Sequence, residues 1–598
     1  MPIVNADVAA VFGLIADLLE VQGANPFRIR AYRNAARTLA ELGRSVKAMV
    51  EHGEDLDALP GIGPDLAGKI AEVVTTGTCA QLEALRKELP QAVTGLLAIR
   101  GLGPKRVRSL HDELGIQTME QLLGAARDGR IRQVRGFGPE TERQILTAAA
   151  EHLSQERRFK LVVASQVAEA LLSELKAVPG VRHAVAAGSL RRMRDTVGDL
   201  DLLVTAKRGS PAMERFAAGA DVERVLSRGS TRASVVLRSG LQVDLRAVAP
   251  VSFGAAWMYF TGSKAHNIAL RRMAQDAGLK LNEYGLFRGT QRVAGDSEAS
   301  VYQALGLPFI EPELREDRGE IEAARSNRLP HLVAFADLRG DLHSHTKESD
   351  GHDTLEAMAE AARERGLKYL AVTEHSKRLA LARGLDAGRL ERQMVRIDEL
   401  NARLKGLVLL KGVEVDILED GTLDLPDAVL ERLDLVVAAV HHRFDLSRDK
   451  QTARVLRAMD HRCFSILAHP TGRLIDERAA YDIDLARVIR KARERGCFLE
   501  LNAHPSRLDL DEVACRMARD EGVLVSINSD AHSTVEFDNL RLGIGQARRG
   551  WLQCADVLNT RGIEELRPLL AATMGRSAPP ARRAASRLAT VRREGHMA

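Results

Sequence analysis

The sequence has few cysteines and lacks any long apolar run. Its five cysteines, at positions 79, 463, 497, 515 and 554, include no Cys-x-x-Cys pair. This spacing excludes a disulfide framework and is typical of a reducing cytoplasm. No apolar run approaches the ~20 residues of a membrane span, and Met1–Ala10 lacks a basic and then apolar signal segment. We therefore expect a cytoplasmic protein that does not enter a membrane.

The length and composition indicate an ordinary soluble protein with several domains. The chain has 598 residues, which is more than a single compact domain usually contains. Hydrophobic residues make up 45% of it and charged residues 28%, as in typical globular proteins. We therefore expect several domains, each with a core of its own.

Histidines and carboxylates recur at short intervals between Asp341 and His532. Ten of the 17 histidines lie in this third of the chain. Imidazole nitrogens and carboxylate oxygens together suit borderline divalent ions such as Zn, Mn or Fe. The candidate residues are more than one ion can bind, which predicts a site of two or three metals. Such a site could hold the attacking and the leaving oxygen of a phosphoryl displacement. The residues of this pattern are Asp341, His343, His345, Asp350, Glu374, His375, Glu414, His441, His442, His469, Asp530 and His532.

Short apolar runs alternate with helical patterns in the same region. Runs rich in Val, Leu and Ile, as buried parallel strands are, span residues 367–372, 407–410, 435–440, 464–467, 498–501 and 523–527. Helical patterns between them include residues 355–365, 485–495 and 511–521. The candidate ligands follow the runs directly, and a β/α barrel carries its chemistry at the carboxyl ends of its strands. The sequence therefore predicts a β/α barrel with a metal site on one rim.

Three segments near the N-terminus each place a Gly-x-Gly turn between two helical patterns. They are Leu59–Ile70, Ile99–Val107 and Val134–Thr141. The glycines let backbone amides approach a phosphate at the start of the second helix, whose positive dipole end favours an anion. The segments resemble the helix-hairpin-helix motif, which binds the DNA backbone without reading sequence. The third fits less well, because Glu140 and Glu142 would repel phosphate. The residues expected to contact DNA are Gly61, Gly63, Lys69, Gly101, Gly103 and Lys105.

The middle of the chain carries a second set of acidic residues. Asp199 and Asp201 are separated by one residue on a predicted strand, so their side chains point to the same face. There they can hold two Mg²⁺ ions against a triphosphate, and Asp244 offers a third carboxylate. Gly188-Ser189 brings a backbone amide and a hydroxyl to the phosphates, and Arg192 can stabilise their charge. Together these features form a nucleotidyltransferase signature, shared by small-substrate transferases and by enzymes that add nucleotides to RNA ends.

The segment from Met258 to Leu286 distinguishes this chain from both of these classes. It resembles the nucleotide-selecting subdomain of the family X DNA polymerases, the DNA polymerase beta-like repair enzymes. The resemblance implies that Tyr259-Phe260 lies against the sugar and disfavours a ribose hydroxyl. It also implies that Asn267 and Arg271 face the minor-groove side of the nascent pair and the template. The positions assigned to the nucleotide are Gly188, Ser189, Arg192, Gly198, Tyr259, Phe260, Gly262, Asn267 and Arg271.

Four positions depart from this family or bear on a further activity. Lys69 matches the Schiff-base lysine of the 5′-deoxyribose-phosphate lyase, but Asp65 replaces a supporting lysine. Lys69 is therefore expected to be either a lyase nucleophile or a phosphate clamp. Val197 replaces a phosphate-binding serine, and Lys264 occupies a position that is acidic in the vertebrate enzymes and contacts the incoming base. Both changes bear on nucleotide affinity.

The region from Asp341 to about Leu570 resembles the PHP (polymerase and histidinol phosphatase) family. Members of that family hydrolyse phosphate esters, some as phosphatases and some as nucleases acting on DNA. The resemblance implies a trinuclear site. Its nine ligands match His343, His345, Asp350, His375, Glu414, His441, His469, Asp530 and His532.

For a few residues near these nine, the sequence leaves the role undecided. Glu348 and His352 are within reach of the position assigned to Asp350. Glu374 stands where the family more often has Asp, and the change keeps the carboxylate. His442, like His504, has no role in the family's pattern, so we interpret both as structural or substrate-facing.

The fold class that follows is multidomain, α+β and α/β, with N-terminal helix-hairpin-helix domains, a nucleotidyltransferase palm with a mixed sheet, and a distorted C-terminal β/α barrel. The expected divisions are a helical domain at 1–92, a second helical domain at 93–155, the palm at 156–250, the nucleotide-selecting subdomain at 251–315, a linker at 316–339, the barrel at 340–574 and a disordered basic tail at 575–598.

The expected function is DNA-directed synthesis that fills short gaps in repair, with Asp199, Asp201 and Asp244 as the catalytic carboxylates. The barrel is expected to act as a metal-dependent 3′-5′ exonuclease, with abasic-site cleavage and 3′-phosphate removal as further possibilities. The alternative is a polymerase that binds gapped DNA and whose barrel is only structural. The expected cofactors are Mg²⁺ or Mn²⁺ at the aspartates and two or three Mn²⁺, Zn²⁺ or Fe²⁺ ions in the barrel. The expected partners are gapped or nicked DNA and dNTPs, bound by a monomer.

Overall fold

The structure is a computed structural model that describes residues 3–42, 44–88, 96, 102–116, 118–154, 158–207 and 210–576. Gly101 and the predicted tail beyond residue 576 lie outside the described residues. All five cysteines are free thiols. In the part that the structure describes, no helix is both long and apolar enough to span a membrane.

The N-terminal part, called here the helical region, consists of helices around two apolar cores. The turn before α4, before α7 and before α9 ends in a glycine, and a proline follows at the first helical position. Proline is favoured there because its missing N–H would have no partner in the first turn. The helices of this region are α1 (Asn5–Val21), α2 (Pro26–Glu41), α3 (Val46–Glu51), α4 (Pro64–Thr76), α5 (Ala80–Glu88), α7 (Pro104–Leu114), α8 (Met119–Arg127) and α9 (Pro139–Ser154).

The central region is built on a five-stranded mixed sheet with the order β2-β4-β7-β6-β5. Only β4 and β7 run parallel, and the other neighbours are antiparallel. Helix α10 packs on β2 and β4. The elements are β1 (Phe159–Lys160), α10 (Leu161–Lys176), β2 (Val181–Ala186), α11 (Gly188–Arg191), β3 (Thr196–Val197), β4 (Asp199–Ala206), α12 (Ala212–Ala217), β5 (Val222–Arg228), β6 (Arg232–Leu237) and β7 (Gln242–Ala247).

A smaller unit follows the sheet and has its own apolar core. Its buried centre also contains charged residues, of which Arg315 and Glu320 are fully buried. The elements are α13 (Phe253–Thr261), α14 (Lys264–Asp276), β8 (Lys280–Asn282), β9 (Gly285–Arg288), β10 (Gln291–Ala294), α15 (Glu298–Ala304), the 3-10 turn η4 (Pro312–Leu314) and α16 (Glu320–Arg325).

The C-terminal part is a distorted barrel of parallel strands. One sheet has the order β11-β12-β13 and the other β14-β15-β16-β17-β18. Two parallel bridges, His375 with Glu414 and Ser344 with Ala531, join the sheets at both sides. The strands are β11 (Gly340–Asp341), β12 (Tyr369–Val372), β13 (Val408–Lys411), β14 (Glu414–Asp416), β15 (Val437–Ala439), β16 (Ile466–Leu467), β17 (Phe498–Asn502) and β18 (Val525–Asn528). A barrel of this kind presents its functional side chains at the carboxyl ends of the strands.

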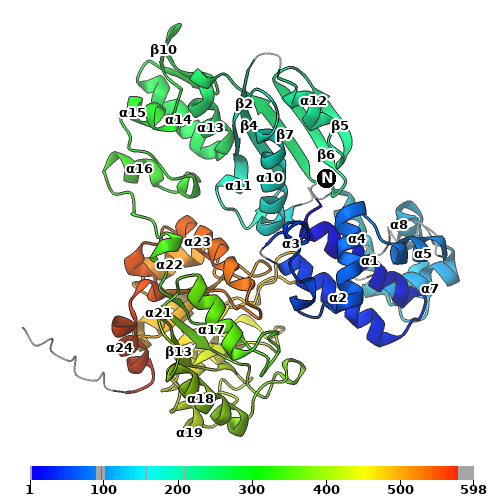
Figure 1. The fold of residues 1–598 in the computed structure, drawn as a ribbon, viewed down its shortest axis with the longest axis vertical. Coiled ribbons are helices and arrows are strands. Elements are labelled where there is room, and N and C mark those ends of the chain that lie inside the picture. Colours follow the sequence, from blue (N-terminus) through cyan, green and yellow to red (C-terminus); the bar gives the residue numbers. More distant parts are fainter. Residues whose placement is uncertain are drawn as a thin grey trace, which may run out of the picture.

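Helices surround the barrel strands and bury their apolar faces against them. Figure 1 shows the barrel and the helical region side by side at one end of the central sheet, and α23 lies between the barrel and that sheet. The helices are α17 (Leu355–Glu364), α18 (Ala387–Asn401), α19 (Asp427–Leu430), α20 (Arg448–Met459), α21 (Leu485–Arg495), α22 (Glu512–Asp520), α23 (Leu540–Arg549) and α24 (Ile563–Thr573).

Candidate functional site

The three predicted aspartates meet on the two parallel strands of the central sheet. Asp201 on β4 lies directly opposite Asp244 on β7, and Asp199 is opposite Gln242. Alternate residues of a strand share a face, so Asp199 and Asp201 lie on the same side. Asp199 is exposed, whereas Asp244 is buried. Ser234 on β6 donates a hydrogen bond from its hydroxyl to Asp244.

The acidic cluster has an unfavourable electrostatic environment without a cation. Burial, followed by the charges of Asp199 and Asp244, raises the pKa of Asp201 to about 7, and only Arg246 and Arg192 oppose this effect. Carboxylates held this close together destabilise one another's charged forms. The donor set is therefore suited to divalent cations, which carboxylates and phosphate oxygens can share.

The predicted phosphate-binding turn lies directly beside Asp201. Gly188 has a φ of +64°, and a Cβ on it would lie 2.7 Å from Asp201 Oδ2, so only glycine fits this approach. The amide of Ala187 donates to the Asp201 carbonyl over 2.8 Å. Ser189 follows in α11. The Arg192 guanidinium lies 3.0 Å from Glu316 Oε1 and also donates to the Thr261 carbonyl.

The residues assigned to nucleotide selection lie on α13 and α14. The rings of Tyr259 and Phe260 meet edge to face with centroids 5.1 Å apart. Arg271 lies 4.8 Å above the Tyr259 ring, and Asn267 donates to the Tyr259 carbonyl over 2.6 Å. Arg246 of β7 lies 4.2 Å from the Phe260 ring, which connects α13 to the acidic strands.

Two glycines complete this set. Gly262 ends α13 with a φ of +73°, and a Cβ on it would lie 3.1 Å from a guanidinium nitrogen of Arg192. Gly198 precedes Asp199, and a Cβ there would lie 3.3 Å from a guanidinium nitrogen of Arg158. Both positions therefore keep the backbone close to arginine side chains at the edge of the site.

The first two turns that were predicted to bind DNA lie directly before α4 and α7. Gly61 has a φ of +67°, and Gly63 precedes Pro64 at the start of α4. Gly103 precedes α7 in the same way, and Lys105 in its first turn is exposed. In each case the positive end of a helix dipole lies at the turn, which favours an anion there.

The third turn has a different arrangement of acidic residues. Glu142 is buried and accepts hydrogen bonds from the Arg132 amide at 2.9 Å and the Arg132 side chain at 2.6 Å. Glu140 pairs with Arg143 on the surface. Glu142 therefore stabilises the turn itself.

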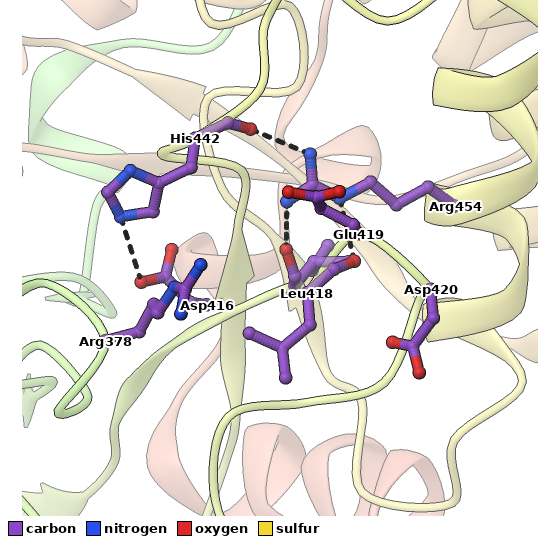
Figure 2. Close-up of a pocket in the computed structure, with 8 residues that line it drawn as sticks. Arg378, Asp416, Leu418, Glu419, Asp420, His442 and Arg454 are labelled. Carbon is purple, nitrogen blue, oxygen red and sulfur yellow. Dashed lines mark hydrogen bonds and ion pairs between the residues drawn. The ribbon is translucent and has the colours of Figure 1, made fainter.

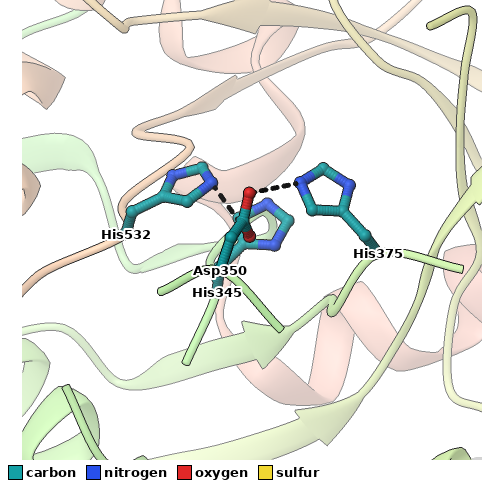
Figure 3. A group of neighbouring side chains, drawn as sticks. All are labelled: His345, Asp350, His375 and His532. Carbon is teal, nitrogen blue, oxygen red and sulfur yellow. Dashed lines mark ion pairs between the residues drawn. The ribbon is translucent and has the colours of Figure 1, made fainter. Parts of the chain in front are cut away.

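All nine predicted ligands of the barrel come together at the rim. Three overlapping groups have ligand atoms within 4.8 Å of one another. The first, shown in Figure 3, contains His345, Asp350, His375 and His532, with the Asp350 carboxylate between the rings of His375 and His532. The other two groups are His343, His345 and Asp530, and His375, Glu414 and His441.

Glu414 is the centre of the cluster. Its carboxylate lies 3.3 Å from His343, 2.7 Å from His375 and 3.2 Å from His441. The ninth residue, His469, contacts it over 3.0 Å. Burial alone would raise the pKa of Glu414, but the charges of His375, His343 and His441 hold it well below its ordinary value.

The cluster fits a set of divalent metals. Buried ring nitrogens of His343, His345 and His469 lack hydrogen-bond partners among the described residues, as do oxygens of Asp350 and Glu414. Burial, followed by neighbouring positive charges, lowers the pKa of His345 to about 3 and that of His469 to about 4. Their rings are therefore neutral at pH 7. Burial would also lower the pKa of His343, His375, His441 and His532, but neighbouring carboxylates raise it. A bound metal would displace the protons of these four rings.

Two carboxylates that orient the ligands were missing from the sequence prediction. Glu500 Oε1 is 2.7 Å from His343 Nδ1, and Asp416 Oδ1 is 2.8 Å from His441 Nδ1. Such partners fix the tautomer and direction of a ligating ring. Both are buried carboxylates within strands, Glu500 in β17 and Asp416 in β14. For Glu500, a charge inside the apolar run 498–501 was the signal that could have revealed it.

Two other carboxylates of the sequence pattern do not face the cluster. The Asp341 carboxylate accepts hydrogen bonds from Ser529 and from the His343 amide. Glu374 accepts from Thr346 and Gln393. Both are therefore occupied in holding the loops of the rim.

The structure also places the alternatives to Asp350. Glu348 pairs with Arg396 on the surface, whereas Asp350 lies 3.4 Å from His375 and 3.5 Å from His532. His352 is near the cluster but in none of its three groups.

A polar pocket of about 290 Å³ adjoins the metal cluster. Asp416, which contacts His441, forms part of its wall with His442 and Arg378. Figure 2 shows these wall residues together, with Asp420 across the pocket. The Arg454 guanidinium donates to backbone carbonyls and shapes the wall.

Comparisons with known sequences agree along the chain. A helix-hairpin-helix domain matches residues 3–79, and a SAM-like helix-hairpin-helix tandem matches 93–151. The DNA polymerase beta thumb matches residues 256–316, and the PHP domain matches 341–504. The solved structure of Leishmania infantum polymerase beta in a ternary P/T complex is 21% identical, with a TM-score of 0.26, and covers 38% of this chain and 98% of that one.

Two relatives match different shares of the chain. A probable phosphatase of Thermoanaerobacter sp. (strain X514) is 32% identical over 33% of this chain and 80% of that protein. The DNA polymerase/3′-5′ exonuclease PolX of Bacillus subtilis (strain 168) is 37% identical over 94% of this chain and 99% of that protein. The chain therefore belongs to the family X DNA polymerases that carry a C-terminal PHP domain.

Proposed function

We propose that this protein is a DNA-directed DNA polymerase that fills short gaps and that its barrel is a metal-dependent 3′-5′ exonuclease. The observation that carries the first activity is the register of β4 and β7, which sets three carboxylates beside the Gly188 turn. The observation that carries the second is the convergence of nine side chains at one rim of the barrel, eight in the three groups and His469 through its contact with Glu414.

In the polymerase centre, Asp199 and Asp201 would hold the divalent ions, either Mg²⁺ or Mn²⁺. When bound, these ions neutralise the triphosphate and lower the pKa of the primer 3′ hydroxyl. Asp244, oriented by the Ser234 hydroxyl, helps to activate that hydroxyl for in-line attack on the α-phosphate. The Gly188 turn and Arg192 bind the phosphates of the leaving group.

In the barrel, the nine-residue cluster would hold two or three ions, and we propose Mn²⁺ because mixed imidazole and carboxylate ligation suits it better than Mg²⁺. When bound, the ions supply an acidified water and positive charge for the phosphodiester oxygens. Glu500 and Asp416 keep the rings of His343 and His441 in the ligating orientation.

The polar pocket beside this cluster is the proposed place for the terminal nucleotide of the DNA 3′ end. It adjoins the cluster through Asp416, and Arg378 and His442 can contact phosphate oxygens from its wall. Replacing each of these two residues with Ala should raise the exonuclease KM for DNA and leave gap filling unchanged. Unchanged KM in both variants would exclude this pocket.

Gapped DNA with a 5′ phosphate is the proposed substrate. The first helical turn, from Gly61 to Lys69, would hold that phosphate while the central region fills the gap. Binding should weaken with salt by ~0.9 log units per log unit of salt for each neutralised phosphate. Equal filling of gaps with a 5′ hydroxyl and a 5′ phosphate would contradict this assignment.

One assay tests both activities. Gapped DNA labelled at the primer 5′ end is incubated with or without dNTPs, in Mg²⁺ and in Mn²⁺. Extension with dNTPs and shortening without them are the expected results, and shortening should be stronger in Mn²⁺. Absence of extension would refute the polymerase, and absence of shortening with every ion tested would refute the exonuclease.

The second candidate function is a gap-filling polymerase whose barrel only braces it. The contacts of α23 with the Arg192 turn favour a bracing role. The completeness of the nine-residue cluster favours hydrolysis. Shortening that is lost on replacing His343 and His345 separates the two.

A further inference from the structure

The barrel contacts the central region at the turn that carries Arg192. Gln546 of α23 donates to the Met193 carbonyl over 3.1 Å, and Arg549 donates to the Arg192 carbonyl over 2.8 Å. A Cβ on Gly545 would lie 2.4 Å from Met193 Cε, so α23 approaches the turn closely. Met193 has a φ of +56°, which is unfavourable for a side chain of this size, and the two hydrogen bonds hold the turn in that shape.

A buried chain of alternating charges extends from the same turn into the barrel. Glu316 Oε1 lies 3.0 Å from Arg192 Nε and 2.9 Å from an Arg549 nitrogen. The other nitrogen of Arg549 lies 2.9 Å from Glu512, which also pairs with Arg318 at 3.3 Å. The Arg549 side chain is only 1% exposed. Burial alone would raise the pKa of Glu316, but the charges of Arg192 and Arg549 lower it.

Glu316 and a triphosphate would compete for the same guanidinium. The proposed function places Arg192 on the nucleotide phosphates, yet in the structure Arg192 is paired with Glu316. A buried carboxylate that loses its partner is strongly destabilised. Without Arg549, the other partner of Glu316 is Arg194 at 3.9 Å. Arg549 is thus the residue that can keep Glu316 paired while Arg192 turns to phosphate.

We propose that Arg549, a residue of the barrel, is a positioning residue for nucleotide addition in the central region. It pairs with Glu316 and fixes the Arg192 carbonyl, which leaves the Arg192 guanidinium available to the triphosphate. This inference rests on the proposed polymerase activity and on the role of Arg192 in it. It assigns to the barrel a part in nucleotide binding that is separate from its metal cluster.

The test is single-nucleotide gap filling by the full-length protein with saturating gapped DNA and varied dNTP. Arg549→Met should raise the KM for dNTP about tenfold, within the usual range of coupling between sites, with kcat changed less than about twofold. Arg548→Met is the matched control. Arg548 is the preceding residue of α23 and pairs with Glu313 at 2.6 Å, so it contacts the same neighbouring unit but not the Arg192 turn. Its KM should stay within about twofold of wild type.

The double variant Arg549→Met/Glu316→Gln distinguishes competition from a general structural effect. A glutamine carries no charge with which to compete against the phosphates, so the KM should return towards the wild-type value. A purely structural role of Arg549 predicts a KM in the double variant at least as high as in the single one. Exonuclease activity of the same preparations reports that the barrel is intact and should be unchanged.

The outcomes are separable. A wild-type protein that fills no gaps would refute the proposed function itself. Gap filling with unchanged KM in Arg549→Met, or with no recovery in the double variant, would overturn the inference alone. If Arg549→Met does not fold, Glu316→Gln alone carries the test. Its KM should be at or below the wild-type value, and a tenfold rise would overturn the inference.

Discussion

Lys69 and Asp65 lie one turn apart on α4, and their ion pair limits the chemistry of Lys69. A Schiff base requires an unprotonated amine. Burial alone would lower the pKa of Lys69, but the hydrogen bond to Asp65 and the charge of Asp65 raise it. We expect only weak borohydride trapping on a 5′-deoxyribose-phosphate end, measured as a cross-linked band.

Two variants check this prediction. Asp65→Asn should strengthen the trapped band, because the neutral amide no longer favours the ammonium form, and Lys69→Ala should abolish it. Strong trapping by the wild-type protein that Lys69→Ala removes would show that Asp65 does not suppress the lyase.

Glu500 is expected to raise the metal affinity of the cluster by orienting a ligand, without being a ligand itself. Its carboxylate orients His343 over 2.7 Å and accepts from Asn528 and the His469 amide. Loss of such a partner typically lowers metal affinity or activity ~10–100-fold. Glu500→Gln should therefore shift the Mn²⁺ titration of the exonuclease to higher concentration by about that factor. Glu494→Gln, an exposed residue of α21, should leave the titration unchanged, and a shift common to both variants would contradict the assignment.

At the scale of elements, the contact between α13 and α15 is set by Gly254. A Cβ on this residue would lie 2.0 Å from the Ser297 backbone, so α13 must move to accept a methyl group. Gly254→Ala should cost ~1–3 kcal/mol of stability and raise the KM for dNTP, because α13 carries Tyr259 and Phe260.

Denaturant unfolding and gap-filling kinetics measure the two effects. Gly124→Ala in α8 is the control: its Cβ would meet nothing within 4 Å, so it should be neutral or should stabilise by ~0.5–1 kcal/mol. An equal free energy of unfolding and an equal KM for dNTP in the two variants would show that the contact between α13 and α15 accommodates a methyl group without destabilisation.

The contact between α22 and α23 should depend on pH. Burial alone would raise the pKa of Glu512, but the charge and hydrogen bond of Arg549 lower it to about 2, below the ordinary value of 4.5. A lowered acid pKa contributes stability above pH 4.5 and loses it as the pH falls towards 2. The contribution at pH 7 is on the order of 3 kcal/mol.

Thermal unfolding of wild type and Glu512→Gln between pH 7 and pH 3 measures this contribution. The wild type should be more stable at pH 7, and the difference should shrink steadily below pH 4.5. A difference that does not change with pH would mean that Glu512 acts through packing and not through its charge.

Apolar runs in the sequence predicted the strands and helices of the barrel well. They did not predict which buried side chains contact one another between elements. Strand β12 lies within the predicted run 367–372, and α21 matches the predicted segment 485–495. The two-residue strand β11 is too short for a recognisable period. The charge of Arg549 looks like that of any surface helix in the sequence, and only the tertiary structure supplies its partners. Six of the nine cluster residues come soon after a predicted apolar run, and His343, His345 and Asp350 were named through the family resemblance. Glu500 lies inside a run and was not predicted.

The whole molecule combines two metal-dependent centres that act in opposite directions on a DNA 3′ end. They lie on different sheets, β4 with β7 and the rim of the barrel, and use different ligands. The two parts also contact each other through α23. When one centre is disabled, the activity of the other therefore shows whether the contact between the two parts is intact.

Replacing the ligands of one centre should leave the other active. Asp199→Ala/Asp201→Ala should abolish gap filling and leave Mn²⁺-dependent shortening largely intact. His343→Ala/His345→Ala removes two ligands from the rim and should abolish shortening, while gap filling continues at a somewhat reduced rate. Both activities are measured on the same labelled gapped DNA, with circular dichroism as the check of folding. A folded His343→Ala/His345→Ala protein that has lost both activities would mean that the ligand cluster organises the polymerase. That result would favour a bracing barrel over an independent nuclease.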